Sequence, residues 1–304
     1  MPAQTEWEEA RERERAAFYE DLEVVDDALR TNPTGALRQS MESCLNQRRH
    51  ANVLMDIGMI ERARRSLQYC FDSLGLARNT VEKVTGPTEE ELQARAAREY
   101  EKAMSLTPDV DNGRAIYADC AACHKPEGWG LITGIVPQIA GQHRSVVISQ
   151  LADYRAGARD SVLMVPYATA ETIGGAQAIA DVAEYISTLE ISVENGTGDG
   201  ANLELGEELY RNHCADCHGA SGEGSDEGAI PRLQAQHYKY LVRQFEWIRD
   251  GKRRNVGDKM KFVEAFSDEE MTAVLDYASR LLPREELRAP PGWQNPDFVQ
   301  RITQ

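Results

Sequence analysis

A pentapeptide containing two cysteines and a histidine occurs twice in this 304-residue chain, and it constrains the fold more than any other feature. The copies are Cys120-Ala-Ala-Cys123-His124 and Cys214-Ala-Asp-Cys217-His218. Within each copy the two thiols are separated by about one helical turn, and the histidine follows directly, so all three side chains share one helical face. The fold must therefore place two thiols and one imidazole close together at two separate sites.

The motif predicts covalent attachment of a haem c at each copy. Two thiols at this spacing can form thioether bonds to the vinyl groups of one haem, and the adjacent histidine can bind its iron. A zinc site would need four ligands at matched spacing, and a redox dithiol would need a βαβ context, neither of which the sequence supports. We expect two covalently bound haem c groups, on Cys120, Cys123 and His124 and on Cys214, Cys217 and His218.

The two motifs belong to a longer internal repeat. A shift of 94 positions superposes both motifs and also Pro137 on Pro231, Gln142-His143 on Gln236-His237, Gln150 on Gln244, Arg155 on Arg249, Gly157 on Gly251 and Arg159 on Arg253. The shift becomes 96 at Met164 and Met260 and 92 at Tyr185 and Tyr277, which places insertions and deletions between elements. Two haem domains of like fold are predicted.

The sixth iron ligand is predicted to be methionine, whose thioether is a common partner of histidine in low-spin haem. Met164 is the one methionine between the two motifs, and Met260 takes its position in the second repeat. Met271 lies in a predicted amphipathic helix, where core packing is its expected role. Histidines outside the motifs could also bind iron, but a structural hydrogen-bonding role is more common for them: His143, His213 and His237.

A haem-binding histidine needs a partner for its other ring nitrogen. Pro137 and Pro231 lie 13 residues after their motif histidines and could offer backbone carbonyls. We count both prolines among the expected haem-binding residues. The alternative is a loop that is simply braced by proline.

The order of these motifs resembles the cytochrome c₄ family over about residues 108 to 283. The second repeat carries the full pattern: His218-Gly219, Gly222-Glu-Gly224, Pro231-Arg-Leu233, Gln236-His237, Arg249-Asp-Gly251-Lys-Arg253, Met260 and Phe266-Ser-Asp-Glu-Glu. The first repeat departs from it, because Lys125 follows His124 where the family usually has glycine. The resemblance implies paired class I cytochrome c folds related by a pseudo-twofold axis, with haem edges close to each other.

The hydrophobic periodicity is helical throughout and shows no convincing strand, which predicts an all-α protein. Helices are expected at about 5–30, 35–57, 60–79, 88–106, 110–121, 144–157, 174–189, 204–214, 238–250 and 268–282. The expected parts are a helical N-terminal domain (1–107), cytochrome c domain 1 (108–190), a glycine-rich linker (191–203), cytochrome c domain 2 (204–283) and an extended C-terminal tail (284–304). The tail should pack on the surface or reach a neighbouring molecule.

The N-terminal domain contains the remaining cysteines, Cys44 and Cys70. A turn at Gly58, near the midpoint between them, would bring both to the same level of a helical hairpin. We therefore predict a Cys44–Cys70 disulfide, with two buried free thiols as the alternative.

The net charge of −16 favours redox partners with a basic docking face, and no segment is basic enough for nucleic acid. No stretch approaches the roughly 18 apolar residues of a membrane span. Haem attachment of this type occurs outside the cytoplasm in such families, so a periplasmic location is expected. The start of this numbering lacks an apolar core, and we expect that a signal segment is missing from it.

With both irons coordinated by histidine and methionine, neither would have an open site, so we expect an electron carrier and not an enzyme. It would link a donor dehydrogenase or quinol-oxidising complex to a terminal acceptor. One alternative is a fixed subunit in which residues 1–107 bind a catalytic partner or another copy of the chain. Another is a haem enzyme acting on a small substrate, although Cys44 and Cys70 lie outside the repeats and would not serve as an unusual distal ligand.

Overall fold

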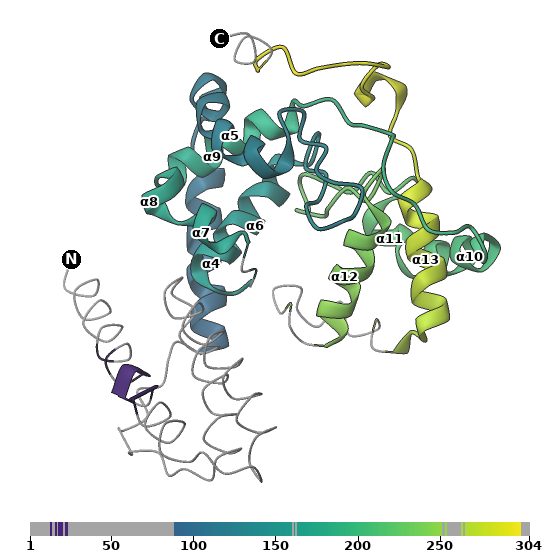
Figure 1. The fold of residues 1–304 in the computed structure, drawn as a ribbon, viewed down its shortest axis with the longest axis horizontal. Helices are drawn as coiled ribbons and strands as arrows, with labels where there is room; N and C mark the ends of the chain where they lie inside the picture. The colour runs from purple at the N-terminus through teal and green to yellow at the C-terminus, as the bar shows by residue number, and fades with distance from the viewer. Residues whose placement is uncertain are drawn as a thin grey trace, which may run out of the picture. The chain divides into compact units, whose positions relative to one another are not determined.

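Figure 1 shows the fold as a computed structural model, which describes residues 88–159, 161, 163–250, 253, 263 and 265–298, together with 13, 16, 18–20, 22 and 23. The chain divides into two compact units, Met1–Thr88 and Glu89–Gln304. The described residues between 13 and 23 are helical, as predicted for 5–30. The helices predicted at 35–57 and 60–79, the predicted Cys44–Cys70 bond and Met260 lie outside the described residues.

The prediction of an all-α fold is confirmed. The described elements are α4 (Glu89–Met104), α5 (Val110–His124), α6 (Arg144–Ala156), α7 (Val165–Ala168), α8 (Ala170–Ile173), α9 (Ala176–Ser187), α10 (Leu203–His213), α11 (Ala215–His218), α12 (Tyr238–Arg249), α13 (Asp268–Arg280) and the 3₁₀ helix η3 (Glu285–Leu287). Extended pairing among the described residues is limited to two isolated bridges. Within the same residues, no helix has the length and apolar character needed to cross a membrane.

The first and last helices of each repeat cross at a glycine. A β-carbon on Gly113 of α5 would lie 2.1 Å from the carbonyl oxygen of Asp181 in α9. A β-carbon on Gly206 of α10 would lie 2.2 Å from the carbonyl oxygen of Ala273 in α13. Because these contacts are to backbone atoms, glycine is what allows both helix pairs to approach closely. Each crossing adjoins a separate apolar core, with Tyr117 buried in the first and Tyr210 in the second.

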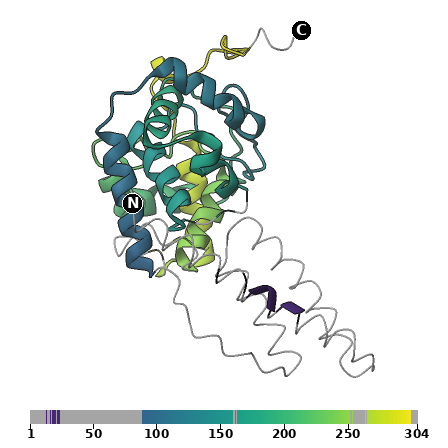
Figure 2. The same ribbon diagram turned by 90° about the vertical axis from the view of Figure 1, so that its left-hand side faces the viewer.

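Helix α4 packs against the first repeat, although the sequence placed the whole of residues 1–107 in an N-terminal domain. It contacts α6 and α9, and Ala103 is fully buried in the core of the first repeat. Glu99 of α4 accepts a hydrogen bond from Arg155 of α6 at 2.6 Å. Because α4 packs on α6 and α9, the second compact unit begins at Glu89, the first residue of α4. The two views in Figures 1 and 2 both show α4 beside these helices.

The two repeats meet through reciprocal hydrogen bonds. Gln142 accepts from the Arg232 backbone nitrogen at 2.9 Å and donates to the Arg232 carbonyl at 3.1 Å. Gln236 accepts from the Gln138 nitrogen at 3.1 Å and donates to the Gln138 carbonyl at 2.7 Å. The 94-residue shift relates Gln142 to Gln236, and it relates their partners Gln138 and Arg232 in the same way. The interface therefore has the pseudo-twofold symmetry that the resemblance implied.

The C-terminal segment turns back from the second repeat to the first (Figure 1). After η3, a parallel bridge joins Arg288 to Ile191, which follows the last helix of the first repeat. Residues 288–298, named here the C-terminal strap, then run over the first repeat. The predicted tail thus packs on the surface of its own chain as far as residue 298.

Candidate functional site

Both motifs lie at the end of the first helix of their repeats, but the helices differ. In the first repeat, α5 continues without a break from Val110 to His124. In the second, α10 ends at His213, and the short helix α11 carries the remainder of the motif to His218. The second thiol of each motif is exposed and the first is half-buried, and none of the four forms a disulfide. Each motif thus has one accessible thiol and one partly covered thiol, both free to form a thioether.

Each motif histidine hydrogen-bonds to the backbone carbonyl suggested by the sequence. The Nδ1 atom of His124 lies 3.0 Å from the Pro137 oxygen, and that of His218 lies 2.9 Å from the Pro231 oxygen. With Nδ1 donating to a carbonyl, each ring has the tautomer that leaves Nε2 with a lone pair for a metal. The same geometry therefore appears at both sites.

A glycine closes the loop between each histidine and its proline. The Gly130 nitrogen donates to the His124 carbonyl at 2.9 Å, and the Gly224 nitrogen donates to the His218 carbonyl at 2.7 Å. Both glycines have a φ near +65°, and a β-carbon would lie 2.4 Å from the Pro137 oxygen at Gly130 and 2.7 Å from the Pro231 oxygen at Gly224. Glycine thus lets the loop bring the proline carbonyl to the histidine.

Burial sets the protonation state of these groups in the polypeptide. Burial lowers the pKa of His124 to about 4, and it also lowers the pKa of His218. Both imidazoles are therefore neutral at pH 7, as a metal ligand must be. Burial raises the pKa of the Cys120 thiol to about 12, helped by the Asp119 carboxylate, and burial raises that of Cys214 to about 11.

The residue after each motif histidine has the same backbone conformation in both repeats but a different identity. Lys125 has φ 68° and ψ 160°, and Gly219 has φ 81° and ψ 159°. This region is freely available to glycine and costs other residues about 1–3 kcal/mol. The sequence had marked Lys125 as a departure from the family pattern. The structure shows that the first repeat keeps the glycine conformation in spite of it.

The methionines are placed as far as the structure describes them. Met164 is half-buried and precedes α7, and its backbone nitrogen lies 3.3 Å from the Ser161 hydroxyl. Met260, the predicted second ligand, lies outside the described residues. Met271 is 4% exposed in the apolar core of the second repeat, which confirms its predicted packing role.

Arg155 fixes the segment that carries Met164. Its guanidinium donates to the carbonyls of Ala168 at 2.9 Å and Gly174 at 2.8 Å, at the ends of α7 and α8. Its repeat equivalent, Arg249, pairs with Asp268 at 2.8 Å at the start of α13. The sequence repeat aligns Arg155 with Arg249, but only the structure shows which groups each arginine contacts.

The second arginine of the repeat pattern lies at the boundary between the repeats. Arg159 and Arg253 both donate to the side-chain oxygen of Gln244, at 2.7 and 3.0 Å. Arg253 also reaches Gln150 at 3.3 Å. Four residues from two aligned positions of the repeat therefore meet in one partly buried network.

His143 and His237, two histidines outside the motifs, form structural hydrogen bonds. His143 Nε2 lies 2.7 Å from the Glu223 carbonyl, and His237 Nε2 lies 2.8 Å from the Trp129 carbonyl. The other ring nitrogen of His237 accepts from the Gly196 nitrogen at 3.2 Å. These contacts join the repeats or the linker, in keeping with the structural role preferred from the sequence. His213 stacks edge-on against Phe266, with ring centroids 5.4 Å apart.

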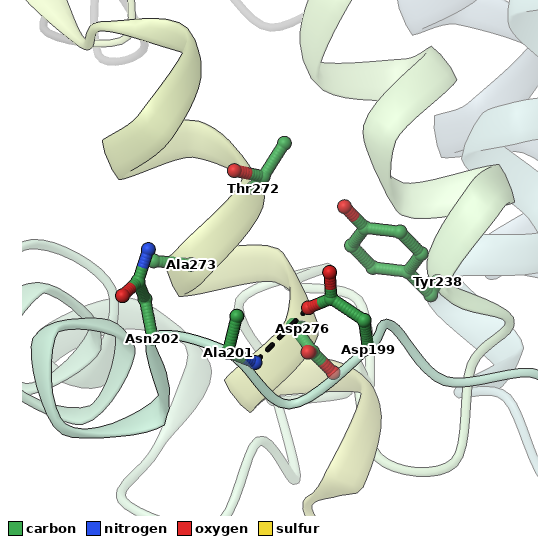
Figure 3. A pocket seen from close by; sticks show the side chains of 7 residues that line it. All are labelled: Asp199, Ala201, Asn202, Tyr238, Thr272, Ala273 and Asp276. Carbon is green, nitrogen blue, oxygen red and sulfur yellow. Dashed lines mark hydrogen bonds between the residues drawn. The ribbon is translucent and has the colours of Figure 1, made fainter.

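A hollow of about 190 Å³ lies between the linker, the start of α12 and α13, and Figure 3 shows the side chains that line it. Asp276 lies beneath it, and its carboxylate accepts from the backbone nitrogens of Gly198 at 2.9 Å and Gly200 at 2.7 Å. Arg280 pairs with the same carboxylate at 2.8 Å. None of the predicted haem-binding residues lines this hollow, and Asp276 serves to anchor the linker.

The residues of each motif fit a covalently held haem. Two thiols and one histidine converge at a helix end, the histidine is neutral, and its Nδ1 atom is already bonded to a proline carbonyl. The same arrangement with a carbonyl-bonded histidine orients imidazole ligands in metal sites generally. The thiols would hold the macrocycle and the imidazoles would bind its iron.

The Cytochrome c family model matches the chain twice, over residues 110–190 and 203–281. The chain is 30% identical over 190 residues to cytochrome c4 of Azotobacter vinelandii, a match that covers 57% of this chain and 89% of that protein. It is 35% identical over 173 residues to cytochrome c4 of Thiocapsa roseopersicina, covering 53% and 86%.

A third relative is named thiosulfate dehydrogenase electron acceptor, from Stutzerimonas stutzeri. It is 30% identical over 199 residues, covering 60% of this chain and 92% of that protein. Among solved structures, reduced recombinant cytochrome c4 from Pseudomonas stutzeri matches with a TM-score of 0.53 and 30% identity, covering 58% of this chain and 100% of that chain. The similarity thus extends over both repeats.

Proposed function

Because this chain belongs to the cytochrome c family, as a di-haem protein of the cytochrome c₄ type, we propose that it relays single electrons between periplasmic redox proteins. It binds two haem c groups covalently. When bound, each haem supplies an iron that alternates between the ferrous and ferric states. The observation that best supports a relay is the equivalent histidine–proline geometry in both repeats.

The protein's own residues would fix each haem in place. Cys120 and Cys123, or Cys214 and Cys217, hold the macrocycle through thioethers, so the cofactor does not dissociate between electron transfers. His124 and His218 would bind the iron, and the Pro137 and Pro231 carbonyls hold their rings in one orientation. A fixed ligand geometry keeps structural change between oxidation states small, which suits rapid electron transfer.

Met164 and Met260 are proposed as the distal ligands. Substituting each by alanine in the complete holoprotein tests this, with optical and low-temperature paramagnetic spectra of the oxidised form. We expect both haems of the wild type to be low-spin and each substitution to remove one methionine-ligated signal. Met271→Ala is the matched control, because Met271 is buried in the core and should leave both signals in place.

A haem that is high-spin in the wild type, or unaffected by its methionine substitution, would contradict this ligation. It would instead favour the alternative of a haem enzyme with an open coordination position. Turnover of thiosulfate or peroxide by the purified protein would then be the decisive assay.

The donor is proposed to be a dehydrogenase or a quinol-oxidising complex, with a terminal acceptor downstream. The relative named thiosulfate dehydrogenase electron acceptor supports a dehydrogenase as donor. The net charge of −16 supports a partner with a basic docking face. Stopped-flow association with such a partner should slow as ionic strength rises, whereas a rate independent of salt would contradict electrostatic steering.

Residues 1–107 could instead fix the protein in a larger assembly, through a catalytic partner or a second copy of the chain. The predicted Cys44–Cys70 disulfide would support such a module. Size measured at several protein concentrations, for the wild type and Cys44→Ser, distinguishes the two cases. A concentration-independent monomer would favour the free carrier.

A further inference from the structure

The C-terminal strap lies beyond both cytochrome c matches, the second of which ends at residue 281, yet it contacts the first haem site. Trp293 packs against Trp129 with ring centroids 5.8 Å apart and ring planes at 40° to each other. Phe298 packs edge-on against Tyr117 with centroids 5.9 Å apart, and Tyr117 precedes Cys120 by one helical turn. The strap therefore touches the polypeptide on both sides of the first motif.

Asn295 is the most deeply buried part of the strap, with 3% of its surface exposed. Its side-chain amide donates to the Pro126 carbonyl at 2.7 Å and to the Tyr185 hydroxyl at 3.0 Å. Pro126 is the second residue after His124. Asn295 thus hydrogen-bonds directly to the turn that leads away from the haem-binding histidine.

The turn after the motif histidine has a different residue in each repeat, and in the part of the chain that the structure describes, only the turn that lacks glycine is contacted by the strap. Lys125 occupies the conformation for which the second repeat uses Gly219. A tyrosine hydroxyl donates to the carbonyl at this position in each repeat, from Tyr117 to Lys125 and from Tyr210 to Gly219, both at 2.8 Å. Among the described residues, only the first repeat adds a side-chain donor at the next carbonyl, through Asn295.

We propose that Asn295 of the C-terminal strap is a positioning residue for the first haem, because it holds the Lys125–Pro126 turn that follows His124. The glycine at the equivalent place makes such a clamp unnecessary in the second repeat. This inference rests on the proposed binding of the first haem by His124, which the wild-type spectra test separately.

The turn can affect the haem because it is linked to His124 through two hydrogen bonds. The loop that begins at Lys125 returns through Gly130, whose nitrogen donates to the His124 carbonyl at 2.9 Å. The same loop leads to Pro137, whose carbonyl holds the His124 ring at 3.0 Å. A relaxed turn would change the orientation and basicity of the imidazole, and both influence the reduction potential of a bound haem.

The test is the midpoint potential of each haem in the complete holoprotein carrying Asn295→Asp, which keeps the side-chain shape but replaces the amide donor. The first haem is identified as the one missing from Cys120→Ala/Cys123→Ala. We expect its potential to shift while that of the second haem stays unchanged. Asn295→Ala gives the same comparison if the aspartate variant fails to assemble.

Two further variants separate positioning from general loosening of the strap. Asp297→Asn weakens strap contacts with Arg114 and Tyr185 and leaves the bond from Asn295 to Pro126, so it should not move either potential. Lys125→Gly should suppress the effect of Asn295→Asp, because glycine adopts this turn without a clamp. Unchanged potentials in both Asn295 variants, equal shifts at both haems, or the same shift in Asp297→Asn would overturn the proposal.

Discussion

The two repeats place the same haem-binding geometry on differently supported turns. In both, a proline carbonyl holds the motif histidine at about 3 Å and a glycine closes the loop. The second repeat turns after its histidine with Gly219, and the first does so with Lys125 under the C-terminal strap. The histidine–proline geometry is thus the same in both repeats, although the residues that stabilise the following turn differ. This indicates that the geometry of the site is required, and that more than one local sequence can provide it.

The largest expected effect separates the two sites completely. Cys120→Ala/Cys123→Ala should leave one covalently bound haem per chain, and so should Cys214→Ala/Cys217→Ala, because each thiol pair serves its own repeat. Denaturing mass spectrometry measures the number of attached haems. Loss of both haems from either variant would mean that the sites do not assemble independently.

The helix crossing is shared by both repeats, and a methyl group there should be costly in each. Gly113→Ala and Gly206→Ala would place a β-carbon within 2.2 Å of a backbone oxygen, so each should lower the free energy of unfolding by about 3 kcal/mol. Chemical denaturation followed by circular dichroism measures this. Gly175→Ser is the control, since a β-carbon there has no heavy atom within 4 Å and should change stability little.

The loop glycines test whether the histidine–proline contact matters equally at both sites. Gly130→Ala and Gly224→Ala would push against the Pro137 and Pro231 carbonyls at a positive φ, costing about 2 kcal/mol each. Each should also shift the reduction potential of its own haem only. Spectroelectrochemistry resolves the two potentials, and a shift at the wrong haem would contradict the assignment of loops to sites.

The smallest predicted effect concerns the interface between the repeats. Gln236 is 7% exposed and Gln142 is more exposed, although they make equivalent hydrogen bonds. Removing a buried partner leaves polar groups unsatisfied, so Gln236→Ala should cost about 2 kcal/mol and Gln142→Ala about 1 kcal/mol. Denaturation measures both values. Equal costs would show that water does not reach the Gln142 side of the interface.

The expected positions of helices and motifs could be derived from the sequence because both depend on local pattern. The helices predicted at 110–121, 144–157, 238–250 and 268–282 begin and end within a few residues of α5, α6, α12 and α13. The proline partners of His124 and His218 followed from the 94-residue repeat and the chemistry of imidazole ligands. Distal ligation by Met164 and Met260 stays a prediction.

Contacts between distant segments could not be derived in this way. Asn295 meets Pro126 across 169 positions, and nothing in the spacing of either residue indicates the other. The same holds for α4, whose helical pattern was visible but whose packing on α6 and α9 was not. The local sequence of a helix specifies which of its residues are buried, but it does not specify which other helices they pack against.

The sequence by itself determined two covalent haem sites in an all-α fold, because thiol spacing, helical periodicity and an internal repeat are properties of neighbouring residues. Only the tertiary structure decided how the repeats join through Gln142 and Gln236 and how the strap returns to the first site. These contacts arise from the close packing of distant surfaces, where shape and hydrogen-bond geometry must be satisfied together.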